Sequence, residues 1–118
     1  MTRILVVEDN KTNRYLINFI LTKKGYEVIN AVTGEESIEL AAKEKPDLIL
    51  MDIQLPGING FEATKEIKQS NMSGNVPIIA LTSYAEVGDR EKAVKVFTGY
   101  IEKPINPDTF MEEIEKFL

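Results

Sequence analysis

Short apolar runs alternate with longer amphipathic segments along the chain. Three of the runs, residues 4–7, 48–51 and 78–81, are apolar at every position. A strand with one solvated face would alternate apolar and polar residues, so these continuous runs predict strands that are buried on both faces. Two further runs, residues 26–31 and 100–101, complete a predicted set of five strands.

Each predicted strand is followed by a segment with helical spacing. In the first of these segments, Leu16, Ile17, Ile20 and Leu21 recur on the period of an α-helix. Gly25 then follows as the residue type that commonly ends a helix at the C′ position. The helices that the pattern predicts cover residues 13–24, 33–45, 61–69, 86–96 and 107–118.

Five consecutive β–α units predict an α/β fold. Strands buried on both faces form parallel sheets covered by helices on each side, and right-handed crossovers make such a sheet doubly wound. The common strand orders are 3-2-1-4-5-6 and 2-1-3-4-5, and five strands favour the second, flavodoxin-like order. We therefore expect one domain over residues 1–118, with a five-stranded parallel sheet in the order 2-1-3-4-5 and five flanking helices.

Composition narrows the classes of function. The 118 residues have a net charge of −5, which argues against a nucleic-acid-binding face, and no apolar run approaches the ~20 residues of a membrane span. The absence of cysteine and histidine leaves carboxylates, hydroxyls, lysines and tyrosines for any acid, base or nucleophile. We expect a cytoplasmic domain that has neither a nucleic-acid nor a membrane partner.

Polar side chains follow four of the five predicted strands at the point where each strand ends. Glu8 and Asp9 follow the first strand, Asp52 the third, Thr82 the fourth and Lys103 the fifth. In a parallel sheet of order 2-1-3-4-5 these four strands are neighbours, and their carboxyl ends meet at one edge. We therefore expect the five side chains to converge.

Three carboxylates and a lysine at one edge suit phosphoryl chemistry. Glu8, Asp9 and Asp52 would repel one another in a partly desolvated cleft, and Mg²⁺ is the cation that such hard oxygen ligands favour. Lys103 offers a point charge to a phosphate oxygen, and the Thr82 hydroxyl offers a hydrogen bond. A carboxylate can itself accept a phosphoryl group as an acyl phosphate.

A purely structural role competes with each candidate residue taken alone. Asp is common before a Pro-Gly turn, which fits Asp52, and Glu8-Asp9 can cap the helix that follows. Thr82 suits a strand, and Lys103 suits a solvated surface. The combination of acids and lysine at one edge favours the chemical role.

Four segments of the chain match a known pattern in order and spacing. They are Val7–Asn10, Met51–Gly57 with Gly60, Ala80–Thr82 and Gly99–Pro104. Together they resemble the receiver domain of two-component response regulators, and the resemblance covers the chain end to end. The order 2-1-3-4-5 is also that of the chemotaxis receiver, so it belongs to the resemblance and is not independent support for it.

The resemblance implies a magnesium site and a phosphoacceptor. Asp52 would accept the phosphoryl group, and Glu8 and Asp9 would hold Mg²⁺ together with Asp52 and the backbone carbonyl of Gln54. The side chains of Gln54 and Tyr84 would tune hydrolysis of the acyl phosphate.

The resemblance also implies a switch. Thr82 and Lys103 would contact the phosphoryl group, and Tyr100 would be the aromatic residue whose rotamer follows Thr82. Taken from the residues alone, Tyr100 suits core or rim packing. The Lys103–Pro104 bond would be cis, a form that is accessible mainly before proline.

By the same resemblance, the function would be signalling and not metabolic catalysis. A histidine kinase or histidine phosphotransfer protein would donate the phosphoryl group, and the domain would catalyse only its own phosphorylation and dephosphorylation. A downstream protein would bind through the fourth helix, the fifth strand and the fifth helix. One departure falls on that face: the family usually has an Ala-Gly pair where this chain has Lys95-Val96, followed by Phe97. Val suits a left-handed C′ residue poorly, so either the helix continues or the segment is remodelled.

Two other classes of protein share parts of this pattern. A phosphohydrolase with an aspartyl-phosphate intermediate needs a second acid two residues after the nucleophile, where this chain has Gln54, and usually a cap domain. A flavodoxin-like binding module needs a glycine- or hydroxyl-rich phosphate loop after the first strand, where this chain is acidic. A partly exposed stripe on the first helix near Ile17 and Leu21 is either core packing or a surface for a kinase.

Overall fold

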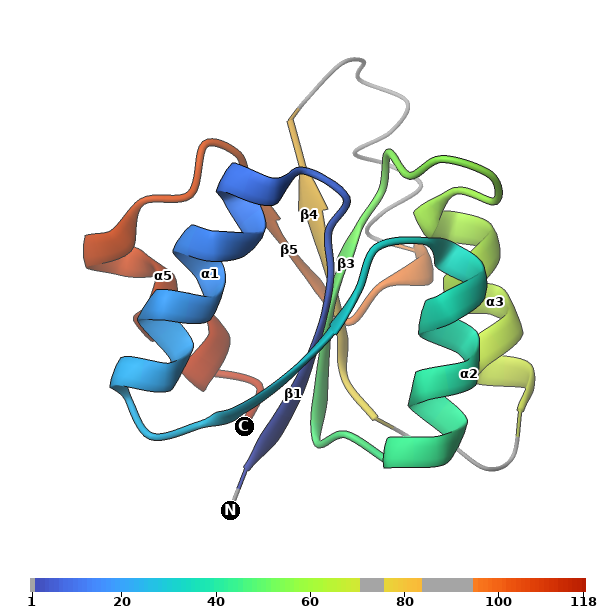
Figure 1. Ribbon diagram of the computed structural model, residues 1–118, viewed down its shortest axis with the longest axis horizontal. Coiled ribbons are helices and arrows are strands. Elements are labelled where there is room, and N and C mark those ends of the chain that lie inside the picture. The colour runs from blue at the N-terminus through green and yellow to red at the C-terminus, as the bar shows by residue number, and fades with distance from the viewer. Residues whose placement is uncertain (1, 71–75, 84–94) are drawn as a thin grey trace.

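The fold is a five-stranded parallel sheet with helices on both faces (Figure 1). The computed structural model describes residues 2–70, 76–83 and 95–118. The sheet has the order β2-β1-β3-β4-β5, which confirms the predicted order. The strands are β1 Arg3–Val7, β2 Glu27–Ala31, β3 Leu48–Asp52, β4 Ile78–Thr82 and β5 Gly99–Glu102.

Two helices cover each face of the sheet within the described residues (Figure 1). Helices α1 (Lys11–Lys23) and α5 (Pro107–Glu115) lie on one face, and α2 (Gly34–Glu44) and α3 (Gly60–Gln69) lie on the other. The described part of the chain therefore contains four helices, and the predicted five are not confirmed. Most of the predicted helix over 86–96 lies in residues 84–94, outside the described residues.

The three central strands are buried on both faces, as their continuous apolar runs predict. Alternate residues of each strand enter opposite cores, because successive side chains of a strand point to opposite faces. Val6 and Leu50 pack toward α1 and α5, whereas Val7 and Met51 pack toward α2 and α3. Ile17 and Leu21 of α1 are fully buried in the first of these cores, so core packing is the correct alternative for these two residues.

Asparagine and threonine caps begin each described helix directly beyond a strand or loop. The side chains of Asn10, Thr33, Asn59 and Asn106 accept hydrogen bonds from backbone N–H groups of the first turns of α1, α2, α3 and α5. These bonds satisfy donors that a helix leaves open at its N-terminus. At the other end of α1, Gly25 has φ +91°, which confirms the predicted helix stop.

The segment that departs from the family pattern remains helical where the structure describes it. Lys95 and Val96 have helical conformation, and neither has the left-handed conformation that an Ala-Gly stop would supply. The Val96 carbonyl accepts a hydrogen bond from Lys68 Nζ of α3. Two bonds then join Thr98 to β4, from Thr98 N to Ile78 O at 2.8 Å and from Ile78 N to Thr98 Oγ1 at 3.1 Å.

Candidate functional site

The carboxyl ends of β1, β3, β4 and β5 bring the predicted site residues to one edge of the sheet. Asp52 is the last residue of β3 and Thr82 is the last residue of β4. Glu8 and Asp9 directly follow β1, and Lys103 directly follows β5. The register explains the convergence, because β1 pairs with β3 up to Val7 and Met51, and Asp52 pairs with Leu81 of β4.

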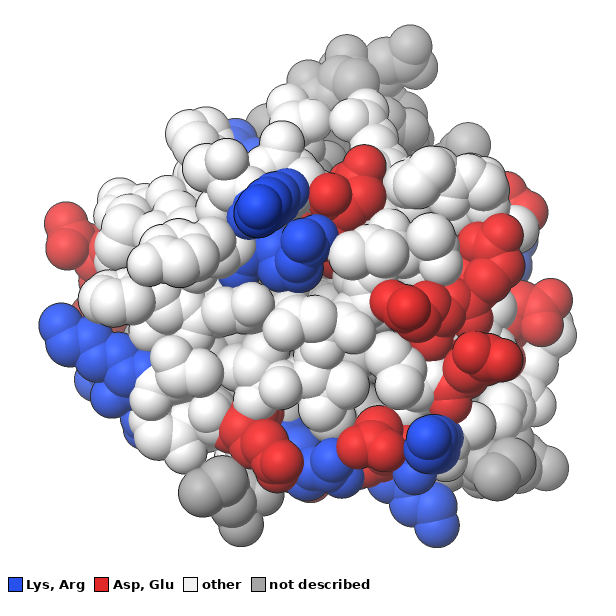
Figure 2. Space-filling view, in the orientation of Figure 1, with Lys and Arg blue, Asp and Glu red and all other residues white. Residues whose placement is uncertain are grey.

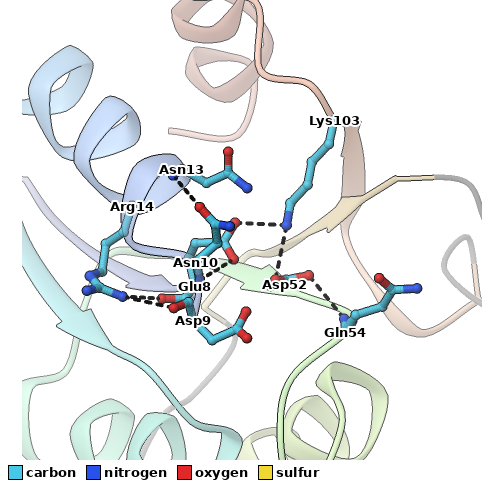
Figure 3. A network of polar contacts seen from close by, with 8 residues as sticks. All are labelled: Glu8, Asp9, Asn10, Asn13, Arg14, Asp52, Gln54 and Lys103. Carbon is cyan, nitrogen blue, oxygen red and sulfur yellow. Dashed lines mark hydrogen bonds and ion pairs between the residues drawn. The ribbon is translucent and has the colours of Figure 1, made fainter.

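Three carboxylates form the centre of the site (Figure 3). Glu8, Asp9 and Asp52 each offer one oxygen atom, and these atoms all lie within 4.8 Å of one another. Glu8 is 0% exposed and Asp52 is 4% exposed, whereas Asp9 is solvent-exposed. Two charges are therefore held in a desolvated position, where they need a cationic partner.

Lys103 supplies that partner for both buried carboxylates (Figure 3). Its Nζ lies 2.8 Å from Glu8 Oε1 and 3.0 Å from Asp52 Oδ2. Glu8 Oε1 accepts no aligned hydrogen bond from any described residue, so the Glu8 contact is an ion pair only. The backbone N–H of Lys103 donates to Thr82 O at 2.6 Å, which ties the lysine to the end of β4.

The pKa values of the two buried acids move apart. Burial is the main cause that raises the pKa of Asp52 to about 7, and the negative Glu8 beside it adds to the effect. Burial also opposes the charge of Glu8, but the neighbouring Asp52 carboxyl and the Lys103 ammonium hold the pKa of Glu8 below its usual value. Burial likewise opposes the charge of Lys103, yet its two carboxylate partners raise its pKa. Near neutral pH the Asp52 carboxyl is therefore partly protonated, whereas Glu8 stays ionised.

Backbone N–H groups fix the orientation of both buried carboxylates. Gln54 N donates to Asp52 Oδ1 at 3.0 Å, and Asn10 N donates to Glu8 Oε2 at 3.3 Å. The Gln54 side chain is exposed and extends away from the carboxylates (Figure 3). Gly60 makes the turn after Asp52 possible, because a Cβ atom there would lie 2.3 Å from Asp52 O. The sequence therefore places a glycine where the start of α3 passes close to the backbone of Asp52.

Arg14 of α1 is a member of this network that the sequence pattern did not single out. Its Nη1 donates to Glu8 O at 2.9 Å and to Asp9 O at 3.5 Å (Figure 3). The sequence does contain an indication of this role, because Arg14 lies in the first turn of a helix. A cation there is unfavourable for the helix dipole, so its presence indicates a contact outside the helix. The sequence pattern indicates only metal binding or helix capping for the Glu8-Asp9 pair.

The structure describes both predicted switch residues. Thr82 is 7% exposed, and Tyr100 of β5 is half-buried against the core on the α2 and α3 side. Tyr100 pairs with Ala80 in the strand register, two residues before Thr82. The Lys103–Pro104 peptide bond is cis, which confirms that prediction. Tyr84, the other residue that the resemblance linked to hydrolysis, lies outside the described residues.

The acidic centre fits a hard divalent cation. All three groups of the cluster are carboxylates, the ligand type that Mg²⁺ prefers. Glu8 Oε1 is buried and has only its ion pair with Lys103 among the described residues, so this oxygen has no hydrogen bond to lose on binding a metal cation. The exposed side of the cluster at Asp9 leaves room for the waters that Mg²⁺ usually keeps.

A doubly wound 2-1-3-4-5 sheet with an acidic cluster and a lysine at its carboxyl edge defines the class of flavodoxin-like receiver folds. The family model of the response regulator receiver domain matches residues 4–115, so the chain belongs to this family. Receiver domains are signalling domains of two-component systems and not metabolic enzymes. None of the described helices is long and apolar enough to cross a membrane.

Individual relatives agree with this assignment. The polar-differentiation response regulator DivK of Brucella anthropi is 40% identical over 116 residues, which cover 98% of this chain and 94% of that protein. The chemotaxis protein CheY4 of Vibrio cholerae has a TM-score of 0.92 at 30% identity, with 100% and 99% of the two chains covered. The receiver domain of the sensor histidine kinase PA1611 of Pseudomonas aeruginosa has a TM-score of 0.90 at 35% identity, with 98% and 96% covered. That structure has a magnesium ion coordinated in its active-site cleft.

Proposed function

We propose that residues 1–118 form a phosphoacceptor domain in which Asp52 receives a phosphoryl group in a magnesium-dependent reaction. The observation that supports the proposal most directly is the convergence of three carboxylates within 4.8 Å, with Lys103 Nζ 3.0 Å from Asp52. Asp52 lies at the end of a fully buried strand, so its position is fixed while its carboxylate faces the open edge. The magnesium-containing receiver of PA1611 supports the same metal for this chain.

Each residue of the site has a definite part in the proposed reaction. Glu8, Asp9, Asp52 and the Gln54 carbonyl would hold Mg²⁺, which supplies charge neutralisation at the phosphoryl oxygens. One Asp52 oxygen attacks the phosphorus of a partner phosphohistidine, the P–N bond breaks, and the leaving imidazole nitrogen keeps the electron pair. Lys103 donates to a phosphoryl oxygen as the new acyl phosphate forms.

The proposed signal leaves the site through β4 and β5. The Thr82 hydroxyl would bond the phosphoryl group, and Tyr100 would change its rotamer with it. Support comes from the strand register, which places Tyr100 opposite Ala80, and from the bond between Lys103 N and Thr82 O. The phosphoryl donor would be a histidine kinase or phosphotransfer protein. A downstream protein would bind the face formed by the predicted fourth helix over residues 86–96, β5 and α5. We expect these encounters in the cytoplasm.

Phosphorylation with a small phosphodonor tests the proposal without knowledge of the natural kinase. Acetyl phosphate with Mg²⁺ should give the wild type an acid-labile, hydroxylamine-sensitive phosphate, and Asp52→Asn should reduce this label to background because the nucleophile is gone. Asp47→Asn is the matched control, since it makes the same change at the opposite edge of the sheet. Persistent label on the Asp52 variant would refute the assignment. A beryllofluoride titration with and without Mg²⁺ gives an independent measurement.

A further inference from the structure

Arg14 contacts the backbone of the two acids at the site and neither of their carboxylates. Its Nη1 bonds the carbonyls of Glu8 and Asp9, at 2.9 and 3.5 Å. Figure 3 shows Arg14 on one side of this acidic segment, with Lys103 and Asp52 on the other. The segment is therefore held from two sides, by Arg14 through its carbonyls and by Lys103 through the Glu8 carboxylate.

The Glu8–Asp9 segment needs such support because only its first N–H group still bonds to the sheet. The register of β1 with both neighbouring strands ends at Val7. Beyond that point, Glu8 N donates to Ala31 O at 3.1 Å, and Asn10 begins the capping of α1. Two successive carbonyls that converge on one side repel each other, and a guanidinium nitrogen between them offsets that repulsion.

The position of Arg14 near the N-terminus of α1 is unfavourable for the helix itself, because a cation there interacts badly with the helix dipole. The first turn of a helix favours acidic side chains, yet the first turn of α1 has none, and the Arg14 guanidinium reaches back toward its positive end. Figure 2 shows basic side chains beside an acidic one near this end of α1, while acidic side chains gather over α2. The carbonyls of Glu8 and Asp9 attract the Arg14 guanidinium, whereas the N-terminus of the helix repels it.

Building on the proposed metal site, we propose that Arg14 is a positioning residue for Mg²⁺ binding. By holding the carbonyls of Glu8 and Asp9, it orients their carboxylates toward Asp52. Groups that orient metal ligands commonly change metal affinity by about 10–100-fold when they are removed. Arg14 itself donates no oxygen and forms no bond to the ion.

The sign of the effect separates positioning from simple charge. Removing a cation near three carboxylates makes the site more negative and should by itself strengthen Mg²⁺ binding. If Arg14 positions the ligands, Arg14→Gln instead weakens Mg²⁺ binding by about tenfold. Arg14→Lys keeps the charge but loses the planar fork, and we expect a smaller weakening in the same direction.

Titration of the full chain with MgCl₂, followed by calorimetry and by backbone amide spectra, measures these dissociation constants. Lys11→Gln is the matched control, because it removes one charge from the same turn at an exposed residue. It should leave Mg²⁺ affinity unchanged or slightly increased. Thermal unfolding in EDTA shows that each variant is folded, and Arg14→Lys provides the test if Arg14→Gln is not.

The outcomes distinguish this inference from the proposed function. Weaker binding in Arg14→Gln, with Lys11→Gln equal to or tighter than wild type, supports positioning. Arg14→Gln that binds Mg²⁺ as tightly as wild type or more tightly overturns it and leaves the metal site intact. Wild type that binds no Mg²⁺ contradicts the proposed function itself.

Discussion

At the scale of single residues, Asp52 shows how burial and pairing set the chemistry of a carboxylate. A solvated Asp ionises readily, but Asp52 is nearly inaccessible and lies beside the negative Glu8. Lys103 lies 3.0 Å away and stabilises the charged form, without fully offsetting desolvation. The metal-free site therefore stores electrostatic repulsion that a proton or a cation can relieve.

This repulsion predicts how stability depends on pH. Burial raises the pKa of Asp52 to about 7, above the value of 3.8 that it has when unfolded. Between these values the folded protein keeps a proton that the unfolded chain releases, so this carboxylate lowers stability progressively as pH rises to about 7. Without Mg²⁺, Asp52→Asn should be more stable than wild type by about 2 kcal/mol at pH ~8, and the difference should shrink toward pH ~4.

Urea unfolding in EDTA across this pH range measures the difference. Asp47→Asn controls for the loss of one carboxylate from an exposed position. An Asp52→Asn advantage that is the same at both ends of the pH range would contradict the titration of Asp52. A disadvantage at high pH would show that the lost Lys103 contact outweighs the relieved repulsion.

At the scale of elements, the helix ends show which boundaries follow local rules. The four described helices begin at Asn or Thr caps, and α1 ends before a glycine in the left-handed region. Helix α2 ends differently, because its C-cap residue Lys45 has φ +47° and is a non-glycine residue in that region. Pro46 follows, so the helix cannot continue. The backbone at this end of α2 is therefore strained, because the Cβ atom of Lys45 disfavours the left-handed conformation.

The strain at Lys45 predicts a stabilising substitution. Lys45→Gly should raise the free energy of unfolding by about 0.5–1 kcal/mol, since glycine adopts the left-handed conformation without the Cβ penalty. Lys24, the C-cap of α1, has φ −84°, so Lys24→Gly should lower the free energy of unfolding by a similar amount. Chemical unfolding measures the change in the free energy of unfolding for both variants. If both substitutions raise this free energy, or both lower it, the explanation from backbone conformation is wrong.

At the scale of the whole molecule, the sheet topology assembles the site from distant parts of the chain. Lys103 follows β5 and Glu8 follows β1, two strands that are separated in the sheet by β3 and β4. The lysine reaches the acids because all the strands are parallel and their carboxyl ends share one edge. One long, flexible side chain thus links both sides of the site.

This link predicts that Lys103 and a bound cation stabilise the fold in the same way. Lys103→Met leaves Glu8 and Asp52 buried without a cation, so the metal-free protein should lose about 2 kcal/mol of stability. Because Mg²⁺ replaces the lost charge, the rise in melting temperature on adding Mg²⁺ should be larger in this variant than in wild type. Lys65→Met, an exposed change on α3, is the control. Equal magnesium-induced shifts in variant and wild type would contradict the prediction.

The sequence by itself determined the five strands, the four helices of the described residues, the sheet order and the set of residues at its edge. Continuous runs such as Leu48–Met51 indicate burial on both faces wherever they occur, because the pattern is local to each strand. Residues at the carboxyl ends of the parallel strands, including Asp52 and Lys103, must then meet at one edge. The four segments that resemble the receiver family contain these site residues, and the structure brings these residues together.

Only the tertiary structure decided which atoms pair. That Lys103 pairs with Glu8 as well as Asp52, and that Arg14 bonds the carbonyls of Glu8 and Asp9, depends on strand register and helix position. The left-handed conformation of Lys45 was equally hidden, because lysine has no preference for it. Periodicity and residue type are properties of the chain, whereas desolvation and the distances between charges arise only when remote segments pack together.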